Sequence, residues 1–261
     1  MSLRARNLTV RLGRSQILHE LNVTAQPGQL TAIIGPNGSG KTTLLRALTG
    51  ELAPYAGAIT LGEHDISTLS PDALAMKRAV LSQQISLAFP FTATEIIRIG
   101  LTSHRGRNSA DDLIRAALAA VDLPAHAGRL YQEMSGGEQQ RVQLARALAQ
   151  VWHPVTEGGP NWLLLDEPVS SLDIAHQLTV MRLASDYARR GGGVVAVMHD
   201  LNLTAMFADH VLLLRNGSML AAGPPANVLT DELLSQAYGC KLVVGKAPES
   251  GVWLLPQAAS L

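Results

Sequence analysis

The sequence contains few cysteines, lysines and aromatic residues. Its 261 residues include one cysteine, Cys240, and aromatic residues make up only 4%. A single cysteine cannot form an internal disulfide, and such chains are typical of the reducing cytoplasm, where we expect this protein to reside. The apolar neighbours Tyr238, Leu242 and Val243 predict that the Cys240 thiol is packed and unreactive.

Net charge and long apolar runs are also missing. Lys plus Arg and Asp plus Glu are both 21, so the formal charge is zero and we do not expect nucleic acid as a partner. No segment has the roughly 18 consecutive apolar residues that a spanning helix needs. The N-terminal MSLRARNLTV carries arginines without a following apolar segment, so we expect neither export nor insertion. Any membrane role would depend on a separate protein.

Apolar residues are nevertheless abundant, at 47% of the chain. They form short continuous runs, which are typical of strands buried on both faces of a parallel sheet. The runs cover residues 30–34, 79–81, 162–165, 194–198 and 211–214. Asn216-Gly217 after the last run predicts a two-residue β-hairpin. We therefore predict an α/β fold.

Between residues 94 and 150 the pattern becomes helical. Ser109 is the expected N-cap of a helix whose apolar residues recur on one face between 113 and 121. We interpret this region as a helical subdomain inserted into the sheet. The predicted parts are a sheet core of residues 1–84 and 158–224, a helical subdomain of residues 85–157, and a C-terminal extension of residues 225–261.

A glycine-rich segment follows the apolar run 30–34 and precedes a predicted helix at residues 41–48. It matches the phosphate-binding pattern GxxxxGK[ST], in which backbone N–H groups and a helix N-terminus bind phosphate. Its residues are Gly35, Pro36, Asn37, Gly38, Ser39, Gly40, Lys41, Thr42 and Thr43. We expect Lys41 to reach the β- and γ-phosphates and Thr42 to ligate Mg²⁺. A fortuitous glycine turn would not explain one of only four lysines at this place.

Two acidic residues, Asp166 and Glu167, follow the apolar run 162–165. Ligands of open α/β sheets bind where strands end, so we expect Asp166 to hold Mg²⁺ and Glu167 to act as the base beside the attacking water. Because Pro168 follows, the pair alone could equally form a turn or a helix cap. The phosphate-binding pattern favours the catalytic interpretation.

A third candidate site precedes a predicted helix at residues 139–149. Ser135, Gly136 and Gly137 offer backbone N–H groups at a helix start and therefore a second anion site. A capping box would explain Ser135 and Glu138 but not the paired glycines.

Taken in order, these segments resemble the ABC ATPase family over nearly the whole chain. The series is the phosphate loop, Gln83, Met134-Ser-Gly-Gly-Glu138, Asp166-Glu167, Ser171-Leu-Asp173 and His199. The resemblance implies a P-loop NTPase core with an inserted helical subdomain. It also implies that Gln83 senses Mg²⁺ and the γ-phosphate and that His199 contacts the γ-phosphate. Taken alone, His199 would more often be a core histidine and Gln83 a surface residue.

The resemblance further implies partners. In this family the phosphate loop of one subunit meets the signature segment, here residues 134–138, of another, so ATP lies between two chains. A head-to-tail homodimer with two ATP sites follows, in which Asp173 reaches the partner's site. Two copies of an integral membrane permease would dock near Gln83 at the cytoplasmic face of the bacterial inner membrane. At the position where the family usually stacks an aromatic ring on adenine, this chain has Leu12.

Within the family, three segments are similar to ATPases that import iron-siderophores, cobalamin and haem. They are Leu81-Ser-Gln-Gln84, Phe89-Pro-Phe-Thr92 and Met198-His-Asp-Leu-Asn-Leu203. Gly158-Gly-Pro-Asn-Trp162 and Ala175-His-Gln177 are similar to the haem importers in particular. Haem would arrive through a periplasmic binding protein and the permease. The histidines His64, His153 and His176 lack ligand spacing, so we expect them on the solvated surface.

Three alternatives remain. The ATPase could serve a ferric-siderophore or cobalamin importer. A soluble ABC protein of DNA repair or translation usually has two fused ATPase units or a long coiled-coil insertion, and this chain has neither. A P-loop kinase or GTPase would leave the signature segment unexplained, and no Asn-Lys-x-Asp guanine motif is present.

Overall fold

A six-stranded sheet forms the centre of the computed structural model, which describes every residue except 84–88, 102–106, 248–249, 253–255 and 260–261. Its strand order is β12-β11-β3-β10-β9-β6. The bounds are β3 (Leu30–Ile34), β6 (Arg78–Leu81), β9 (Trp162–Asp166), β10 (Gly193–Val197), β11 (His210–Arg215) and β12 (Ser218–Gly223). All neighbouring pairs are parallel except β11 with β12. Every residue of β3, β9 and β10 is buried, which is why these strands are continuous apolar runs. The α/β prediction is confirmed.

The predicted hairpin joins β11 to β12. Asn216 and Gly217 have φ values of 49° and 74°, the left-handed conformations that a two-residue hairpin of this kind requires. The Gly217 N–H donates to the carbonyl of Ser39 at 3.1 Å, and the Gly217 carbonyl accepts from the N–H of His19 at 2.9 Å. A Cβ at Gly217 would lie 2.1 Å from the Ile17 carbonyl oxygen. The turn therefore touches both the phosphate loop and strand β2 (Ser15–Ala25).

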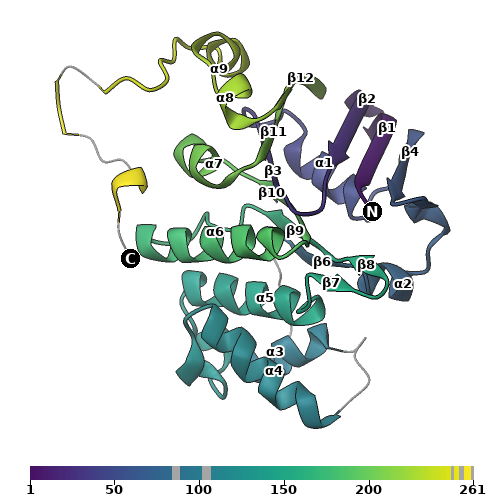
Figure 1. Cartoon of the computed structure of the whole chain (residues 1–261), viewed down its shortest axis with the longest axis vertical. Coiled ribbons are helices and arrows are strands. Elements are labelled where there is room, and N and C mark those ends of the chain that lie inside the picture. Colours follow the sequence, from purple (N-terminus) through teal and green to yellow (C-terminus); the bar gives the residue numbers. More distant parts are fainter. Residues whose placement is uncertain (84–88, 102–106, 248–249, 253–255, 260–261) are drawn as a thin grey trace.

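A second, antiparallel sheet was not predicted from the sequence. It contains β1 (Leu3–Leu12), β2, β4 (Ala56–Leu61) and β5 (His64–Asp65) in the order β2-β1-β4-β5. Bulges shift the register of β1, and Asn7 and Glu20 both have φ of 49°, so the apolar alternation is interrupted. Helix α1 (Lys41–Leu48) packs its buried leucines between this sheet and the central one (Figure 1).

Three helices form a layer on the other side of the central sheet, below α6 in Figure 1. They are α3 (Ala93–Gly100), α4 (Arg107–Ala120) and α5 (Gly136–Gln150), with short 3₁₀ turns η2 (Pro124–His126) and η3 (Tyr131–Glu133) between α4 and α5. We call these elements the helical layer. Ser109 is not the N-cap of α4, because the helix already begins at Arg107. The apolar periodicity begins later than the helix does, so it could not place this start.

The remaining elements surround this framework. Helix α6 (Ile174–Arg189) runs between the sheet and the helical layer, while α7, α8 and α9 lie near β11 and β12 (Figure 1). Their bounds and those of the smaller elements are η1 (Ile66–Thr68), α2 (Pro71–Ala75), β7 (Val155–Thr156), β8 (Gly159–Pro160), α7 (Leu201–Phe207), α8 (Pro225–Val228), α9 (Asp231–Tyr238) and η4 (Pro256–Ala258).

Cys240 is exposed, which corrects the expectation of a packed thiol. Gly239 ends α9 with a φ of 72°, and the chain leaves the helix there, so the apolar neighbours of Cys240 do not enclose it. Across the residues that the structure describes, no helix is both long and apolar enough to cross a bilayer.

Candidate functional site

The candidate site lies where parallel strands of the central sheet end. The phosphate loop follows β3, Gln83 follows β6, Asp166 and Glu167 lie at the end of β9, and His199 follows β10. Because β3, β10, β9 and β6 are neighbours in this order, their carboxyl ends share one edge. Segments that are separated by more than a hundred residues are thereby brought together.

The phosphate loop depends on glycine at its two ends. Gly35 has a φ of 145°, and a Cβ there would lie 2.2 Å from the Leu214 carbonyl oxygen. Gly40 caps α1 with a φ of 98°. Lys41, the first residue of α1, donates from Nζ to the carbonyl oxygens of Gly35 at 2.9 Å and Pro36 at 3.1 Å. Burial lowers the pKa of Lys41, against the opposing effect of the charges on Glu167 and Asp166. The ammonium group therefore lies within the curve of the loop, close to the two carboxylates.

Thr42 and Asp166 form the part of the site that suits a divalent cation. The Thr42 hydroxyl donates to Asp166 Oδ1 at 3.4 Å. Asp166 is buried, and burial followed by the charge of Glu167 raises its pKa. A cation between these oxygens would offset both the cost of burying the Asp166 carboxylate and its repulsion by Glu167. Hydroxyl and carboxylate oxygens are the ligands that Mg²⁺ prefers. The residues present therefore fit Mg²⁺.

The carboxylate of Glu167 connects two other strand ends. Gln83 Nε2 donates to Glu167 Oε2 at 2.9 Å, and His199 Nε2 lies 2.5 Å from Glu167 Oε1. A carboxylate only accepts, so His199 carries its proton on Nε2 in this contact. The backbone of Glu167 has a φ of 50°, an uncommon conformation for a side chain with a Cβ. In this conformation the side chain of Glu167 contacts both Gln83 and His199.

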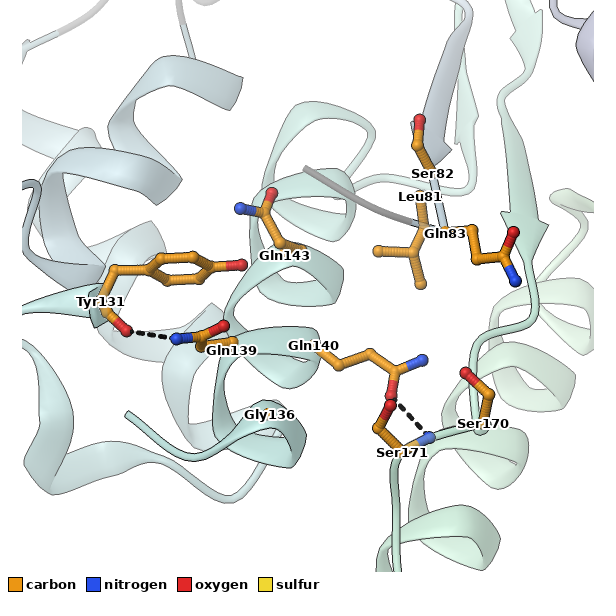
Figure 2. Close-up of a pocket in the computed structure, with 10 residues that line it drawn as sticks. All are labelled: Leu81, Ser82, Gln83, Tyr131, Gly136, Gln139, Gln140, Gln143, Ser170 and Ser171. Atoms are coloured by element: carbon orange, nitrogen blue, oxygen red, sulfur yellow. Dashed lines mark hydrogen bonds between the residues drawn. The ribbon is translucent and has the colours of Figure 1, made fainter. Parts of the chain in front are cut away.

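A polar cavity of about 350 Å³ adjoins Gln83 (Figure 2). It is lined by Leu81, Ser82, Gln83, Tyr131, Gly136, Gln139, Gln140, Gln143, Ser170 and Ser171. Gln140 of α5 reaches across it. Its Nε2 donates to the Glu167 carbonyl at 2.9 Å. Its Oε1 accepts from the Ser171 N–H at 3.3 Å (Figure 2). The helical layer is thus hydrogen-bonded to the backbone of the loop that follows β9.

The N-terminus of α5 holds the signature segment. Ser135 is the N-cap and forms a capping box with Glu138, so both glycines lie in the first turn. The helix begins at Gly136, three residues before the start that we predicted at Gln139. Glu138 also contacts Arg129 Nη1 at 3.2 Å and His126 Nε2 at 3.1 Å. The hydrogen bonds from the backbone and side chain of Ser135, reinforced by these neighbours, lower the pKa of Glu138 to about 2.

The structure groups the expected site residues into two sets. Thr42 contacts Asp166, and Gln83 and His199 contact Glu167, in one connected region at the strand ends. The second set is formed by the helix N-termini at Ser135, Gly136, Gly137 and Asp173, of which Asp173 caps α6. Among the described residues, no hydrogen bond joins the second set to the phosphate loop. Gln84 lies outside the described residues.

Some features of the site could not be found from the sequence. The partners of Gln140 are backbone atoms 27 and 31 residues away, which no local pattern signals.

Arg11 stacks on the exposed ring of Tyr55, with the guanidinium carbon 3.7 Å from the ring centroid. Leu12, at the end of β1, is 44% exposed. His176 is half-buried and bonded to Asp173, which corrects our expectation that it would be a solvated surface residue.

Comparison with known proteins identifies the family. The ABC transporter family model matches residues 18–170. A curated relative from Jannaschia sp. (strain CCS1), described as a hemin import ATP-binding protein, is 59% identical over 97% of this chain and 93% of its own. This chain belongs to the ABC transporter family.

Solved structures of other ABC proteins have the same fold. An inward-facing metal-chelate type ABC transporter is 27% identical, covers 92% of this chain and 90% of its own, and has a TM-score of 0.76. A dimeric bacterial ABC transporter cassette is 26% identical, covers 85% of this chain and 98% of its own, and has a TM-score of 0.75. The P-loop NTPase fold expected for this ABC protein is therefore confirmed.

The low pKa of Glu138 predicts a pH-dependent contribution to stability. In Glu138→Gln the ionised acceptor is lost, so this variant should be less stable than wild type at neutral pH. The difference should shrink as the pH falls from about 4.5 toward 2, because the unfolded chain then gains the proton that folded Glu138 resists. Urea unfolding of both proteins across this range measures the difference. Glu157→Gln, at an exposed position, is the control. A pH-independent difference would contradict the assignment.

Proposed function

We propose that this chain is the ATP-hydrolysing subunit of a haem importer and drives transport through a separate membrane permease. The observation that carries the hydrolytic part is the position of Glu167, which lies between Gln83 and His199 and follows the buried Asp166. The haem assignment rests on the relative that is 59% identical and described as a hemin import ATP-binding protein.

ATP is the proposed substrate of the phosphate loop. The backbone N–H groups of residues 37–43 and the N-terminus of α1 attract the phosphates, and Lys41 reaches the β- and γ-phosphates. The ammonium group of Lys41 is already placed inside the loop by its bonds to Gly35 and Pro36. Little reorganisation is then needed when the phosphates take over these contacts.

Thr42, Asp166 and Gln83 are proposed to hold Mg²⁺ with the nucleotide. The ion, when bound, neutralises charge that develops on the phosphate oxygens. Thr42 contributes a hydroxyl oxygen, Asp166 a carboxylate and Gln83 an amide oxygen. Gln83 already donates through its Nε2 to Glu167, which leaves its amide oxygen available to the cation.

Glu167 is the proposed general base. Its carboxylate takes a proton from the water that attacks the γ-phosphate. His199 donates from Nε2 and can pass this donor to a γ-phosphate oxygen, which would free Glu167 Oε1 for the water. Gln83 and His199 therefore both orient the base and report on the presence of the phosphate.

A homodimer is proposed because one chain carries one phosphate loop and one signature segment. Head-to-tail closure would place Ser135, Gly136 and Gly137 of one subunit against the nucleotide of the other and bring Asp173 to the partner's site. Both anion-attracting segments lie at helix N-termini, of α1 and of α5. The dimeric ABC cassette with a similar fold supports this assembly.

Two copies of a permease are proposed to dock near Gln83, at the cytoplasmic face of the bacterial inner membrane. Among the residues that the structure describes, the exposed large hydrophobic side chain nearest in sequence to Gln83 is that of Phe89, which is 68% exposed and stacks edge-on against Phe91. An exposed aromatic residue next to the helical layer is a typical anchor for a partner. The periplasmic binding protein would act through the permease without touching this chain.

Glu167→Gln tests the hydrolytic site. Loss of the general base should reduce ATP turnover by roughly 10² to 10⁴ while leaving ATP binding intact, because the amide cannot accept the proton. Steady-state turnover and nucleotide binding are measured on the same preparation. Glu157→Gln serves as the control for an exposed glutamate. Turnover within a fewfold of wild type would remove Glu167 from this role.

Gln83→Ala tests coupling to the permease. Nucleotide binding should remain, but most of the stimulation by the permease should be lost, because Gln83 joins the base to the segment between the sheet and the helical layer. ATP turnover with and without permease measures the ratio. The exposed Gln26, changed to Ala, is the control. Equal loss of binding and stimulation would indicate a merely structural role.

Cargo is tested in proteoliposomes that contain this chain and the permease encoded beside it. Haem-loaded periplasmic binding protein should stimulate ATP turnover, whereas cobalamin and ferric siderophores, each on a carrier, should have little effect. Binding of haem to the isolated chain should not be stoichiometric, since His64, His153 and His176 lack ligand spacing. If a siderophore or cobalamin carrier stimulates turnover and the haem carrier does not, the cargo is not haem. The proposal that this chain is an importer ATPase would be unaffected.

A further inference from the structure

His176 lies between two carboxylates from different parts of the fold. It is in the first turn of α6, and 30% of its side chain is exposed. Asp173 lies three residues before it, and Asp122 approaches from the helical layer, after the end of α4. The side chain therefore bridges the loop after β9 and the helical layer.

The contact with Asp173 is made twice. The His176 N–H donates to Asp173 Oδ1 at 2.9 Å, and His176 Nδ1 lies 2.8 Å from the same oxygen. Because a carboxylate only accepts, Nδ1 carries a proton. The backbone bond alone completes the N-cap of α6, so the imidazole bond is additional to capping. These two hydrogen bonds lower the pKa of Asp173.

The contact with Asp122 involves the other ring nitrogen. His176 Nε2 lies 3.7 Å from Asp122 Oδ2, within ion-pair range when the ring is protonated. Asp122 is itself fixed to α5, since its carbonyl accepts from Arg141 Nη1 at 3.1 Å and its Oδ2 lies 4.0 Å from the same nitrogen. Arg141 is buried, so this anchor is held by packing. The charged and titratable groups around the imidazole are thus Asp173, Asp122 and Arg141.

We propose that His176 is a positioning residue for ATP hydrolysis, which orients the carboxylate of Asp173 and ties it to Asp122 of the helical layer. The inference rests on the proposed function, in which Asp173 acts across the dimer. A displacement of the helical layer by the permease would then be transmitted to Asp173 through the imidazole. Gln140 makes a second link to the same loop, at Ser171, so the loop is connected to the helical layer on both sides of Leu172.

Three variants separate the two contacts. His176→Ala removes both side-chain contacts but keeps the backbone cap. His176→Asn retains a short amide donor for Asp173 and no longer reaches Asp122. Asp122→Asn removes the charge that faces His176 and Arg141 but keeps the backbone bond to Arg141, and asparagine tolerates the φ of 58° at this position. Asp186→Asn, which breaks an exposed ion pair with Arg189 on the same helix, is the control.

The measurements are ATP affinity, turnover of the chain alone and stimulation by the permease. In His176→Ala turnover should fall about tenfold with ATP affinity within about twofold of wild type, because a misplaced carboxylate slows the reaction without weakening nucleotide binding. His176→Asn should recover turnover to within about threefold. Both His176→Asn and Asp122→Asn should lose most of the stimulation. The control should behave as wild type.

The opposite results would overturn the proposal. They are wild-type turnover in His176→Ala, turnover in His176→Asn as low as in His176→Ala, a loss of ATP affinity parallel to the loss of turnover, or full stimulation in both His176→Asn and Asp122→Asn. If His176→Ala does not fold, the stimulation of His176→Asn and Asp122→Asn by the permease still tests the proposal. Wild type and Glu167→Gln are measured in parallel. Absence of turnover in wild type would refute the proposed function itself, whereas normal turnover that depends on Glu167 but not on His176 would refute only this inference.

Discussion

Two adjacent carboxylates end a strand that is buried along its whole length. Asp166 and Glu167 carry like charges at the end of β9, and burial and mutual repulsion raise the pKa of Asp166. The surrounding structure offsets this cost with donors from separate elements. Thr42 donates to Asp166, while Gln83 and His199 contact the carboxylate of Glu167. A magnesium ion between Thr42 and Asp166, as proposed, would offset the same repulsion.

The parallel sheet supplies the geometry for this balance. Strands β3, β10, β9 and β6 are neighbours, so the groups that follow each of them meet at one edge. No single segment holds the site together, and each contributes one or two side chains. Gln140 adds a link from the helical layer to the backbone of Glu167. The position of the proposed base therefore depends on both the central sheet and the helical layer.

The sequence was sufficient where a local pattern corresponds to one physical requirement. The buried runs predicted the parallel strands, because strands covered on both faces have no polar side. Asn216-Gly217 predicted the hairpin, since few other residues tolerate its two left-handed conformations. The phosphate loop and the Asp166-Glu167 pair were recognised together with their strands. The roles of the individual site residues remain predictions that the proposed variants test.

The sequence was insufficient where structure depends on distant backbone atoms or on interrupted periodicity. The antiparallel sheet escaped prediction because bulges break the alternation of β1. Gln140 and His176 contact residues that are distant in the sequence, so no local pattern indicates these contacts. Cys240 was judged by its sequence neighbours, although the chain turns at Gly239 and exposes it. In each of these cases the tertiary arrangement outweighs the local signal.

A substitution at Gly217, in the hairpin turn, would disturb the phosphate loop although Gly217 is not part of that loop. Its N–H supports the back of the phosphate loop at Ser39, and its carbonyl holds strand β2 at His19. Any larger residue would collide with the Ile17 carbonyl and strain a φ of 74°. Such a substitution would displace the hairpin turn, which contacts the phosphate loop at Ser39. In a genetic screen it would resemble a defect in a phosphate ligand, although Gly217 lies 174 positions after the end of that loop at Thr43.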